Sequence, residues 1–312
     1  MKTFDAIILG GGAAGLSAAT ALGRFRRSVA VIDAGSPRNA PADGVHNFLT
    51  RDGVNPLELQ RLGRAEASSY GVTFFDGAAR DIQPGFSVTV GDHVLTSQRL
   101  IVATGTVDEL PAIPGLAERW GRDVIHCPYC HGWEVRDRAI GVLGTHARTA
   151  HVALMFRQLS DRVTVFLDPS LELPADELAQ LTARGVTLVT GTISRLHTVD
   201  GALSTVTLDD GSTHPVEALA VGSFMRARVD ALAPLGLVAV DHPSGAGTHL
   251  AVDGFGLTSL PNVWAAGNVG DPMAQVVTSA AQGLAVAAAV NADLIAEEAR
   301  AAVAAAPTTT AR

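Results

Sequence analysis

Two cysteines have the type and spacing that suit redox or metal chemistry. Cys127 and Cys130 are the only cysteines among 312 residues, and His126 and His131 flank them in the stretch IHCPYCHGWE. A zinc site needs four ligands, but no second cysteine pair exists, and the two histidines are too close in sequence to complete a tetrahedron. A structural disulfide closing so short a loop would stabilise the fold little. We therefore expect a redox-active disulfide and no metal.

The composition is that of a globular protein long enough for two domains. Hydrophobic residues make up 47% and charged residues 17%, and the net charge is −8 without a long basic run, so we expect no nucleic-acid partner. The apolar run in the opening MKTFDAIILGGG is too short for a signal peptide, which predicts a cytoplasmic protein. There a CxxC pair is more often catalytic than structural. The uncharged stretch 273–292 is expected to form a buried Ala-rich helix, so we expect no membrane contact.

The first thirty-odd residues predict a nucleotide-binding unit. A short apolar run, AIILG, leads into GGGAAG, then into an Ala/Leu-rich helix and the strand VAVID. Within this strand–helix–strand order, Gly10 allows a tight turn, Gly12 lets the backbone approach a pyrophosphate, and Gly15 permits close packing of helix on strand. The helix N-terminus offers N–H groups to the phosphates. Asp33 ends the second strand, where it can hold a ribose hydroxyl.

A second unit of the same kind follows the cysteines. The pattern predicts a strand at 138–144, a helix at 150–159 and another strand at 162–167. A further strand is expected at 100–105, and a helix at about 275–303 closes the chain. The chain is therefore expected to be α/β, with two nucleotide-binding-like units.

These motifs together resemble the low-molecular-weight thioredoxin reductase group of flavoproteins over nearly the whole chain. The matching stretches are GGGAAGLSAA, ATG, CPYCHG and AAGNVGDPMAQVVTSA. The resemblance implies an α/β fold of two Rossmann-like domains, each with the three-layer ββα arrangement, and a homodimer. It also implies a discontinuous FAD-binding domain at 1–114 and 245–312, with a CxxC-bearing, pyridine-nucleotide-type domain at 115–244.

The same resemblance implies the residues that bind FAD. Carried over by position, they are Gly10, Gly12, Ala13, Ala14, Gly15, Asp33, Asn47, Ala103, Thr104, Gly105, Gly267, Asn268, Gln275 and Val276. The segment 46–48, His-Asn-Phe, falls where family members approach the flavin ring. Asn268 departs from the family's Gly-Asp motif, since it can hydrogen-bond but carries no charge. Gln275 and Val276 begin a helix whose N-terminus would stabilise negative charge on reduced flavin.

The resemblance also assigns roles around the CxxC pair. Cys130 corresponds to the flavin-proximal sulfur and Cys127 to the sulfur that exchanges with substrate by way of a mixed disulfide. His131 falls where many members carry an acid/base Asp, and a histidine titrates near neutrality. His126 is a second candidate base. Asp271 either orients one of these histidines or caps a helix ahead of a proline.

The second glycine turn departs from the family pattern. It reads Gly144-Thr-His146-Ala-Arg-Thr149, with a histidine at the second glycine position and Thr149 in place of a small alanine. A side chain at His146 would occupy space that a pyrophosphate needs. Asp168 stands where NADPH-binding members carry a basic cluster, although acids there can bind the ribose of NAD. We therefore expect that NADPH is not bound.

A flavin, a CxxC pair and a degenerate nucleotide turn together predict reversed electron flow. The chain resembles thioredoxin-reductase-like, FAD-dependent dithiol oxidases, which close disulfides in natural products such as gliotoxin, holomycin and romidepsin. CPYCHGWE is most similar to the members acting on holomycin. The implied substrates are a small-molecule dithiol and O2, with H2O2 as product and a role in antibiotic biosynthesis and self-resistance. The alternatives are a thioredoxin reductase driven by NADPH or ferredoxin, and a flavin-containing redox sensor.

Overall fold

The structure, a computed structural model, describes residues 2–306. The chain forms two compact units. Unit 1 comprises Met1–Arg38, Leu57–Val107 and Met225–Arg312, and unit 2 comprises Asn39–Pro56 and Asp108–Phe224. Each unit is therefore discontinuous in sequence, and each is described separately.

This division differs in detail from the domain boundaries that the sequence predicted at 114 and 245. Residues 225–244 fall in unit 1, where Val229 is buried in the core of the large sheet. Residues 108–114 fall in unit 2, where Leu110 packs against a buried cluster. The segment 39–56 also belongs to unit 2. Side-chain burial, which local sequence patterns do not specify, explains the shifts at 108–114 and 225–244.

Unit 1 is built on a seven-stranded sheet in the order β3-β2-β1-β6-β5-β4, with β19 also paired to β6. The strands are β1 Lys2–Leu9, β2 Val29–Asp33, β3 Thr73–Asp76, β4 Arg80–Gln83, β5 Ser87–Val90, β6 His93–Val102 and β19 Val263–Ala265. Strands β1, β2, β3, β6 and β19 run parallel, whereas β4, β5 and β6 are antiparallel. The central strand β1 thus ends at the sheet edge where the glycine turn begins.

The sheet of unit 1 is buried on both faces. Along β1, Ile7 and Leu9 enter one core cluster, and Ala6 and Ile8 enter another. Such near-continuous burial is typical of parallel strands between two layers. One cluster includes side chains from helices α1 and α6, and the other includes side chains from β4 and β5. The predicted layered α/β architecture is confirmed.

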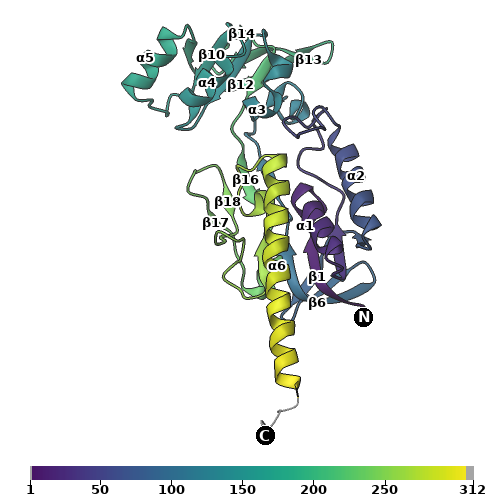
Figure 1. Cartoon of the computed structure of the whole chain (residues 1–312). Coiled ribbons are helices and arrows are strands. Elements are labelled where there is room, and N and C mark those ends of the chain that lie inside the picture. Colours follow the sequence, from purple (N-terminus) through teal and green to yellow (C-terminus); the bar gives the residue numbers. More distant parts are fainter. Residues whose placement is uncertain (1, 307–312) are drawn as a thin grey trace. The chain divides into compact units, whose positions relative to one another are not determined.

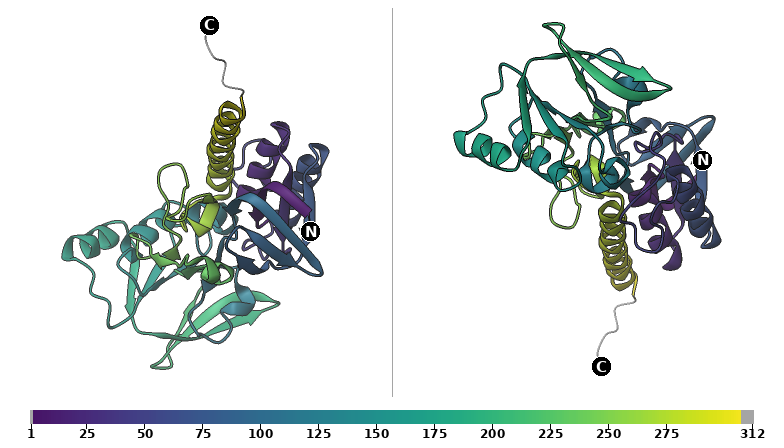
Figure 2. Two further views of the ribbon diagram at one scale, coloured as in Figure 1. Left: turned by 90° about the horizontal axis from the view of Figure 1, so that it is seen from below. Right: turned by 90° about the horizontal axis from the view of Figure 1, so that it is seen from above.

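Three helices belong to unit 1: α1 Ala13–Arg24, α2 Pro56–Ser69 and α6 Val276–Ala305. Helix α6 lies beside α1 (Figures 1 and 2), and a Cβ on Gly283 would overlap the carbonyl of Ala14, so glycine allows this close approach. By length and composition α6 could cross a membrane, but a core helix passes the same test. Its buried residues are Ser279, Gly283, Val286, Ala287, Val290, Asn291 and Leu294. The predicted buried C-terminal helix is confirmed.

Unit 2 contains a second, five-stranded parallel sheet in the order β11-β10-β9-β15-β8. Its strands are β8 Val124–Ile125, β9 Ile140–Gly144, β10 Val163–Leu167, β11 Thr187–Thr190 and β15 Ala218–Ala220, and its helices are α3 Pro128–His131, α4 Thr149–Arg157 and α5 Ala175–Ala183. The predicted strand–helix–strand unit is confirmed as β9, α4 and β10. Two buried clusters again cover the two faces.

The remaining strands are short or antiparallel. Unit 2 carries an antiparallel sheet of β12 Ile193–Val199, β13 Ala202–Leu208 and β14 Thr213–Pro215. Strands β17 Val240–Asp241 and β18 Thr248–His249 form a small ribbon in unit 1. The chain crosses between the units within β7 Thr106–Glu109 and β16 Phe224–Ala227.

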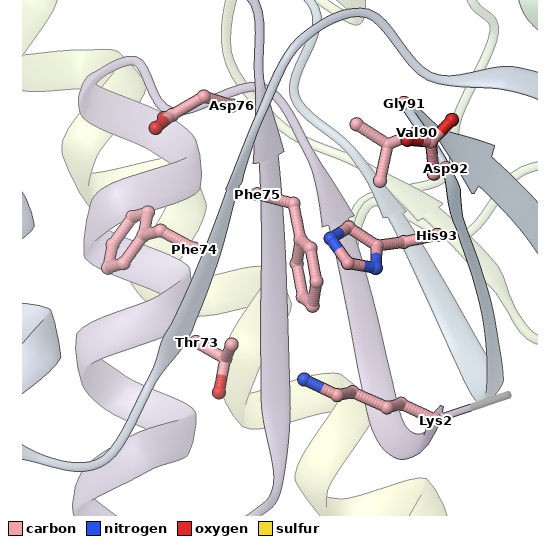
Figure 3. Close-up of a pocket in the computed structure, with 9 residues that line it drawn as sticks. All are labelled: Lys2, Thr73, Phe74, Phe75, Asp76, Val90, Gly91, Asp92 and His93. Carbon is pink, nitrogen blue, oxygen red and sulfur yellow. The ribbon is translucent and has the colours of Figure 1, made fainter.

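Unit 1 has a surface depression, which Figure 3 shows. It is lined by Lys2, Thr73, Phe74, Phe75, Asp76, Val90, Gly91, Asp92 and His93. The ring of Phe75 stands between Lys2 and His93, 5.6 Å from the Lys2 ammonium and 5.4 Å from the His93 ring centroid. Because Lys2 and His93 begin β1 and β6, this depression is at the opposite strand ends from the turn at Gly10.

Candidate active site

The first glycine turn has the shape that a pyrophosphate requires. Gly10 adopts a φ of +106°, and a Cβ there would overlap the carbonyl of Ala103. A Cβ on Gly15 would overlap the carbonyl of Gly10, so this glycine sets how closely α1 approaches the strand. A Cβ on Gly12, by contrast, would meet no atom within 4 Å. Gly12 caps α1, and the open space above it lies at the helix N-terminus, which attracts anions.

Asp33 lies beside this turn, as the sequence predicted. Its Oδ1 accepts a hydrogen bond from the Gly11 amide at 3.1 Å, and its Oδ2 accepts one from Gln60 Nε2 at 2.7 Å. Gln60, on α2, also donates to the Gly11 carbonyl. A carboxylate oxygen has a second lone pair, so Asp33 is held in place and can still accept from a ribose hydroxyl. Gln60 was not predicted, because nothing in its local sequence connects it to the turn.

A second loop of unit 1 approaches the same helix end. A Cβ on Gly267, whose φ is +78°, would crowd Ala14 on α1. The Gly267 amide donates to Gln282 Oε1 at 3.0 Å, and Gln282 Nε2 donates to Asp271 Oδ2 at 3.3 Å. Gln282 therefore ties the loop to α6. The predicted Gly267 thus lies close to the predicted Ala14.

Asn268 holds the loop that precedes α6. Its Nδ2 lies within hydrogen-bond distance of three backbone carbonyls, those of Asp271 at 3.1 Å, Pro272 at 3.2 Å and Ala274 at 2.8 Å. Only a donor suits this position, since a carboxylate would face three acceptors. The departure from the family's aspartate therefore has a structural reason. These contacts use only Nδ2, and the predicted contact with a ribityl hydroxyl would involve Oδ1 of Asn268.

Asp271 has the contacts of a turn residue. Its Oδ1 accepts from the Met273 amide at 3.0 Å, and the Ala274 amide bonds to its backbone carbonyl. Helix α6 begins later, with Gln275 as its N-cap and Val276 as its first residue. Asp271 is therefore a residue of the turn before α6 and not its N-cap, which corrects the capping alternative; the catalytic role of Asp271 stays a prediction.

The ATG motif is fastened within unit 1. The Ala103 amide donates to the Leu9 carbonyl, and Thr104 Oγ1 donates to the carbonyl of Arg228 at 2.7 Å. Gly105, with a φ of +69°, accepts from the Arg228 amide at 3.0 Å. These bonds hold the end of β6 next to the Gly10 turn. The open space at Gly12, the oriented Asp33 and the two helix N-termini together fit a dinucleotide such as FAD.

The cysteine pair lies at the start of a short helix in unit 2. Cys127 precedes α3 in extended conformation, and Cys130 lies within it. Their Sγ atoms are 2.6 Å apart, so two-electron oxidation of the pair would close a disulfide with only a small side-chain shift. A Cβ on Gly132 would overlap Leu159 and the Pro128 carbonyl, which explains a glycine after the histidine. Both cysteines are half-buried. The described part of the chain, residues 2–306, contains no group of three or more side chains suited to a metal.

His131 follows Cys130 in the chain and ends α3. Burial lowers its pKa most, the neighbouring Glu134 raises it, and His46 lowers it. The net direction is downward, so His131 is neutral at pH 7 and can accept a proton. Asp43 also faces it and raises its pKa.

His126 has a different environment. Its Nδ1 lies 3.2 Å from the carbonyl of Val221, which is a geometry for donation to that carbonyl. Such a bond leaves Nε2 as the basic nitrogen. Its ring lies 6.4 Å from the ring centroid of Trp120. The Val221 carbonyl thus orients the His126 ring, which is the contact expected of a residue that fixes the loop.

The segment 39–56 contacts the CxxC helix. Asn47 Nδ2 donates to the backbone carbonyl of Tyr129, between the two cysteines, at 2.7 Å. Asn47 has a φ of +59°, a conformation that asparagine tolerates better than most residues, and its amide donates to Asp52 Oδ1 at 2.9 Å. Asn47, predicted at the flavin, therefore also supports the cysteine pair.

The second glycine turn is filled by its own side chain. A Cβ on Gly222 would lie only 2.6 Å from His146 Nε2, so the imidazole already packs against that backbone. The Arg148 amide donates to His146 Nδ1 at 3.2 Å, and the Thr149 amide and hydroxyl both bond to the His146 carbonyl. Burial, and then Arg148, lower the pKa of His146, so it is neutral.

Asp168 lies at the end of β10, as predicted, but it serves a local turn. Its Oδ1 accepts from the amide and the hydroxyl of Ser170 at 2.9 and 2.6 Å. These bonds lower the pKa of Asp168, with the Ser170 hydroxyl as the largest cause. Asp168 is therefore ionised, which disfavours a 2′-phosphate at this strand end.

A layered α/β fold, a glycine turn with open space and a CxxC pair in a second nucleotide-type unit are the features of a nucleotide-dependent disulfide oxidoreductase. The chain belongs to the pyridine nucleotide-disulphide oxidoreductase family, whose pattern matches residues 4–283. The family is one of oxidoreductase enzymes and implies FAD as cofactor.

Particular relatives are similar over most of their length. Thioredoxin reductase sirT of Leptosphaeria maculans is 32% identical over 92% of this chain and 93% of its own. Thioredoxin reductase aclD of Aspergillus oryzae is 34% identical over 86% of this chain and 88% of its own. The crystal structure of HlmI superposes with a TM-score of 0.89, is 44% identical, and covers 99% of this chain and 98% of HlmI. The predicted thioredoxin-reductase-like fold is confirmed.

Four residues at these sites were missed by sequence reasoning as functional candidates. They are His46, which lies beside the His131 ring, Asp52 and Glu134, which face the two nitrogens of His46, and Gln60, which bonds to Asp33 at the first glycine turn. Two of them had a signal, since His46 belongs to the stretch that resembles the family's flavin-approaching segment and Glu134 belongs to CPYCHGWE. Their partners are set by folding rather than by local spacing.

Proposed function

We propose that the chain is an FAD-dependent dithiol oxidase that closes a disulfide in a small-molecule dithiol. The observation that carries the proposal is the contrast within unit 2, where a CxxC pair with a neutral base accompanies a glycine turn filled by His146. Electrons then enter through the cysteines rather than from NADPH. The similarity to HlmI and to sirT agrees with this class of enzyme.

The chain's own residues account for the thiol chemistry. A substrate thiolate attacks Cys127 Sγ, a mixed disulfide forms, and Cys130 leaves as a thiolate. The second substrate thiol loses its proton to His131 and attacks the substrate sulfur of the mixed disulfide, which expels Cys127. The product is a disulfide, and the pair is left reduced. His126 is the alternative base.

The cofactor would be held by unit 1 at Gly10, Gly12, Asp33 and the Asn268 loop. Bound FAD would supply the two-electron acceptor for the reduced pair, with O2 as terminal oxidant and H2O2 as product. The proposal includes a homodimer and a place in antibiotic biosynthesis, which the family resemblance implies.

Flavin absorbance tests the direction of electron flow. Under nitrogen, dithiothreitol is expected to bleach the bound flavin of the purified protein, and air is expected to restore the colour with stoichiometric H2O2. NADPH is expected to leave the flavin oxidised. Bleaching by NADPH at sub-millimolar concentration, or no bleaching by dithiol, would contradict the proposal.

The second candidate is a thioredoxin reductase driven by NADPH or ferredoxin. It is favoured by the names of the two fungal relatives, both of which are called thioredoxin reductases. It predicts that NADPH or reduced ferredoxin bleaches the flavin and that a protein disulfide is then reduced. The same absorbance experiment, with thioredoxin as the acceptor, separates the two candidates.

A further inference from the structure

A second histidine lies next to the CxxC helix, although it is distant in sequence. The rings of His46 and His131 have centroids 6.5 Å apart and stand nearly perpendicular, with an interplanar angle of 77°. The side chain of His46 is 22% exposed, so it is largely enclosed in unit 2. Glu134, three residues after His131, acts electrostatically on His131 and raises its pKa.

Both nitrogens of His46 face carboxylates. Its Nδ1 lies 3.4 Å from Asp52 Oδ2, and its Nε2 lies 3.4 Å from Glu134 Oε1. Asp52 is anchored because its other oxygen accepts from the Asn47 amide at 2.9 Å. The Asp52 side chain is 72% exposed, so this carboxylate reaches solvent. The histidine therefore stands between the neighbourhood of His131 and a solvated acid.

We propose that Glu134 and His46 pass protons from His131 to Asp52 and solvent, with Glu134 on the Nε2 side of the His46 ring and Asp52 on its Nδ1 side. His46 is thus a positioning residue that acts through His131 and does not itself meet the substrate. The inference deepens the proposed function and rests on it, since the protons are those of the substrate dithiol.

The relay moves protons without electrons. When a substrate thiol is deprotonated, its S–H bond breaks, the sulfur keeps the electron pair, and the proton moves to a nitrogen of His131. It then passes by way of Glu134 to Nε2 of His46, and the proton on Nδ1 leaves through Asp52 to water. The groups that face the two rings are Asp43 and Glu134 around His131, and Asp52 and Glu134 around His46. Each turnover oxidises two thiols. His131 must therefore lose the proton that it accepted before it can deprotonate the next substrate thiol.

The main test is His46→Gln in the FAD-loaded protein, with dithiothreitol as the probe and oxygen uptake as the readout. We expect turnover to fall about ten-fold, less than the loss for removing a direct base. Added imidazole buffer should restore most of the rate, because a small base can carry the proton instead. Asp52→Asn, which keeps the ring and the Asn47 contact, should give a smaller loss with the same rescue. His197→Gln, on β12, is the matched control and should match wild type.

A second readout does not depend on oxidase activity. The ring resonances of His131 are titrated by NMR and assigned with His131→Gln. Since His46 lowers the pKa of His131, His46→Gln should move the titration midpoint of His131 to higher pH. An unmoved midpoint overturns the relay, and so does a rate loss that imidazole fails to repair. Absence of dithiothreitol oxidation in the wild-type protein would instead sink the proposed function, and the midpoint would still decide the role of His46.

Discussion

After β1 the chain turns at Gly10 to Gly15, and after β9 it turns at Gly144 to Thr149, each time between a parallel strand and a helix. The first turn leaves open space where a Cβ on Gly12 would project. At the equivalent place in the second turn, the His146 ring packs against Gly222. The two turns thus share their backbone plan and differ in the space that they leave for a ligand.

The comparison concerns a nucleotide-type fold whose second turn carries a packed side chain. Strands β9 and β10 and helix α4 still form a buried parallel layer around their core. That layer positions β8, which leads directly into the CxxC helix. Unit 2 therefore retains the scaffold for its cysteines while one imidazole fills the pyrophosphate position.

The largest expected effect comes from copying the second turn into the first. Gly12→His should give a folded protein that retains no FAD and has no turnover, because its Cβ meets no protein atom within 4 Å and its ring would occupy the open space. Flavin content and thermal unfolding are measured together. Gly15→Ala is the contrasting variant, since its Cβ overlaps the Gly10 carbonyl and should lower stability. Full FAD retention by Gly12→His would contradict the view that a side chain at this position excludes the pyrophosphate.

Removing the exchanging sulfur tests where the chemistry of unit 2 resides. Cys127→Ser should abolish dithiol oxidation while the protein stays yellow, because the FAD-binding residues proposed for unit 1 are untouched. Oxygen uptake with dithiothreitol is the measurement. Consumption of oxygen near the wild-type rate would show that electrons from the dithiol do not enter through the cysteine pair.

Asn268→Asp restores the family's residue in unit 1 and is expected to weaken FAD binding. The carboxylate cannot donate to the three loop carbonyls, and one lost buried hydrogen bond of this kind corresponds to about ten-fold in affinity. Fluorescence titration of the apoprotein with FAD gives the change. Equal or tighter binding by the variant would mean that the loop does not depend on the amide.

The pH profile tests His131 as base. Its pKa is lowered in the fold, so the neutral form persists below the usual range and turnover should be lost only as the pH falls through that lowered value. Glu134 raises this pKa, so Glu134→Gln should move the acidic limb further down, by up to about one pH unit. The rate of dithiothreitol oxidation between pH 4 and pH 8 is the measurement. A limb that moves upward would exclude His131 as the base.

Opening the second turn should have the smallest effect. His146→Gly is expected to leave FAD content and dithiol turnover at the wild-type level, since the ring packs against the backbone of Gly222. Any new nucleotide binding should favour NADH over NADPH, because the ionised Asp168 repels a 2′-phosphate. Calorimetric titration with each nucleotide measures this. Preference for NADPH would contradict the assignment of Asp168.

Much of the site could be predicted from contiguous stretches. The glycines around Gly12, the acid at Asp33 and the CxxC pair are local patterns whose spacing follows from one turn or one strand. The weak point was the region 39–56, where Asn47 was predicted as a flavin residue although its amide also reaches Tyr129 on the CxxC helix. Similarly, Asp271 was considered as a helix N-cap, but Gln275 has that position. Asp271 instead accepts a hydrogen bond within the turn that Asn268 holds.

The sequence by itself determined the α/β plan, the first nucleotide turn, the redox pair and the side chain that fills the second turn. These depend on short-range sterics, on glycine where a Cβ does not fit, and on alternation of buried residues along strands. Only the tertiary structure decided that Gln60 orients Asp33 and that His46, with Asp52 and Glu134 at its two nitrogens, lies beside His131. Such contacts join segments far apart in the chain, and their geometry is set by how whole layers pack rather than by any local spacing.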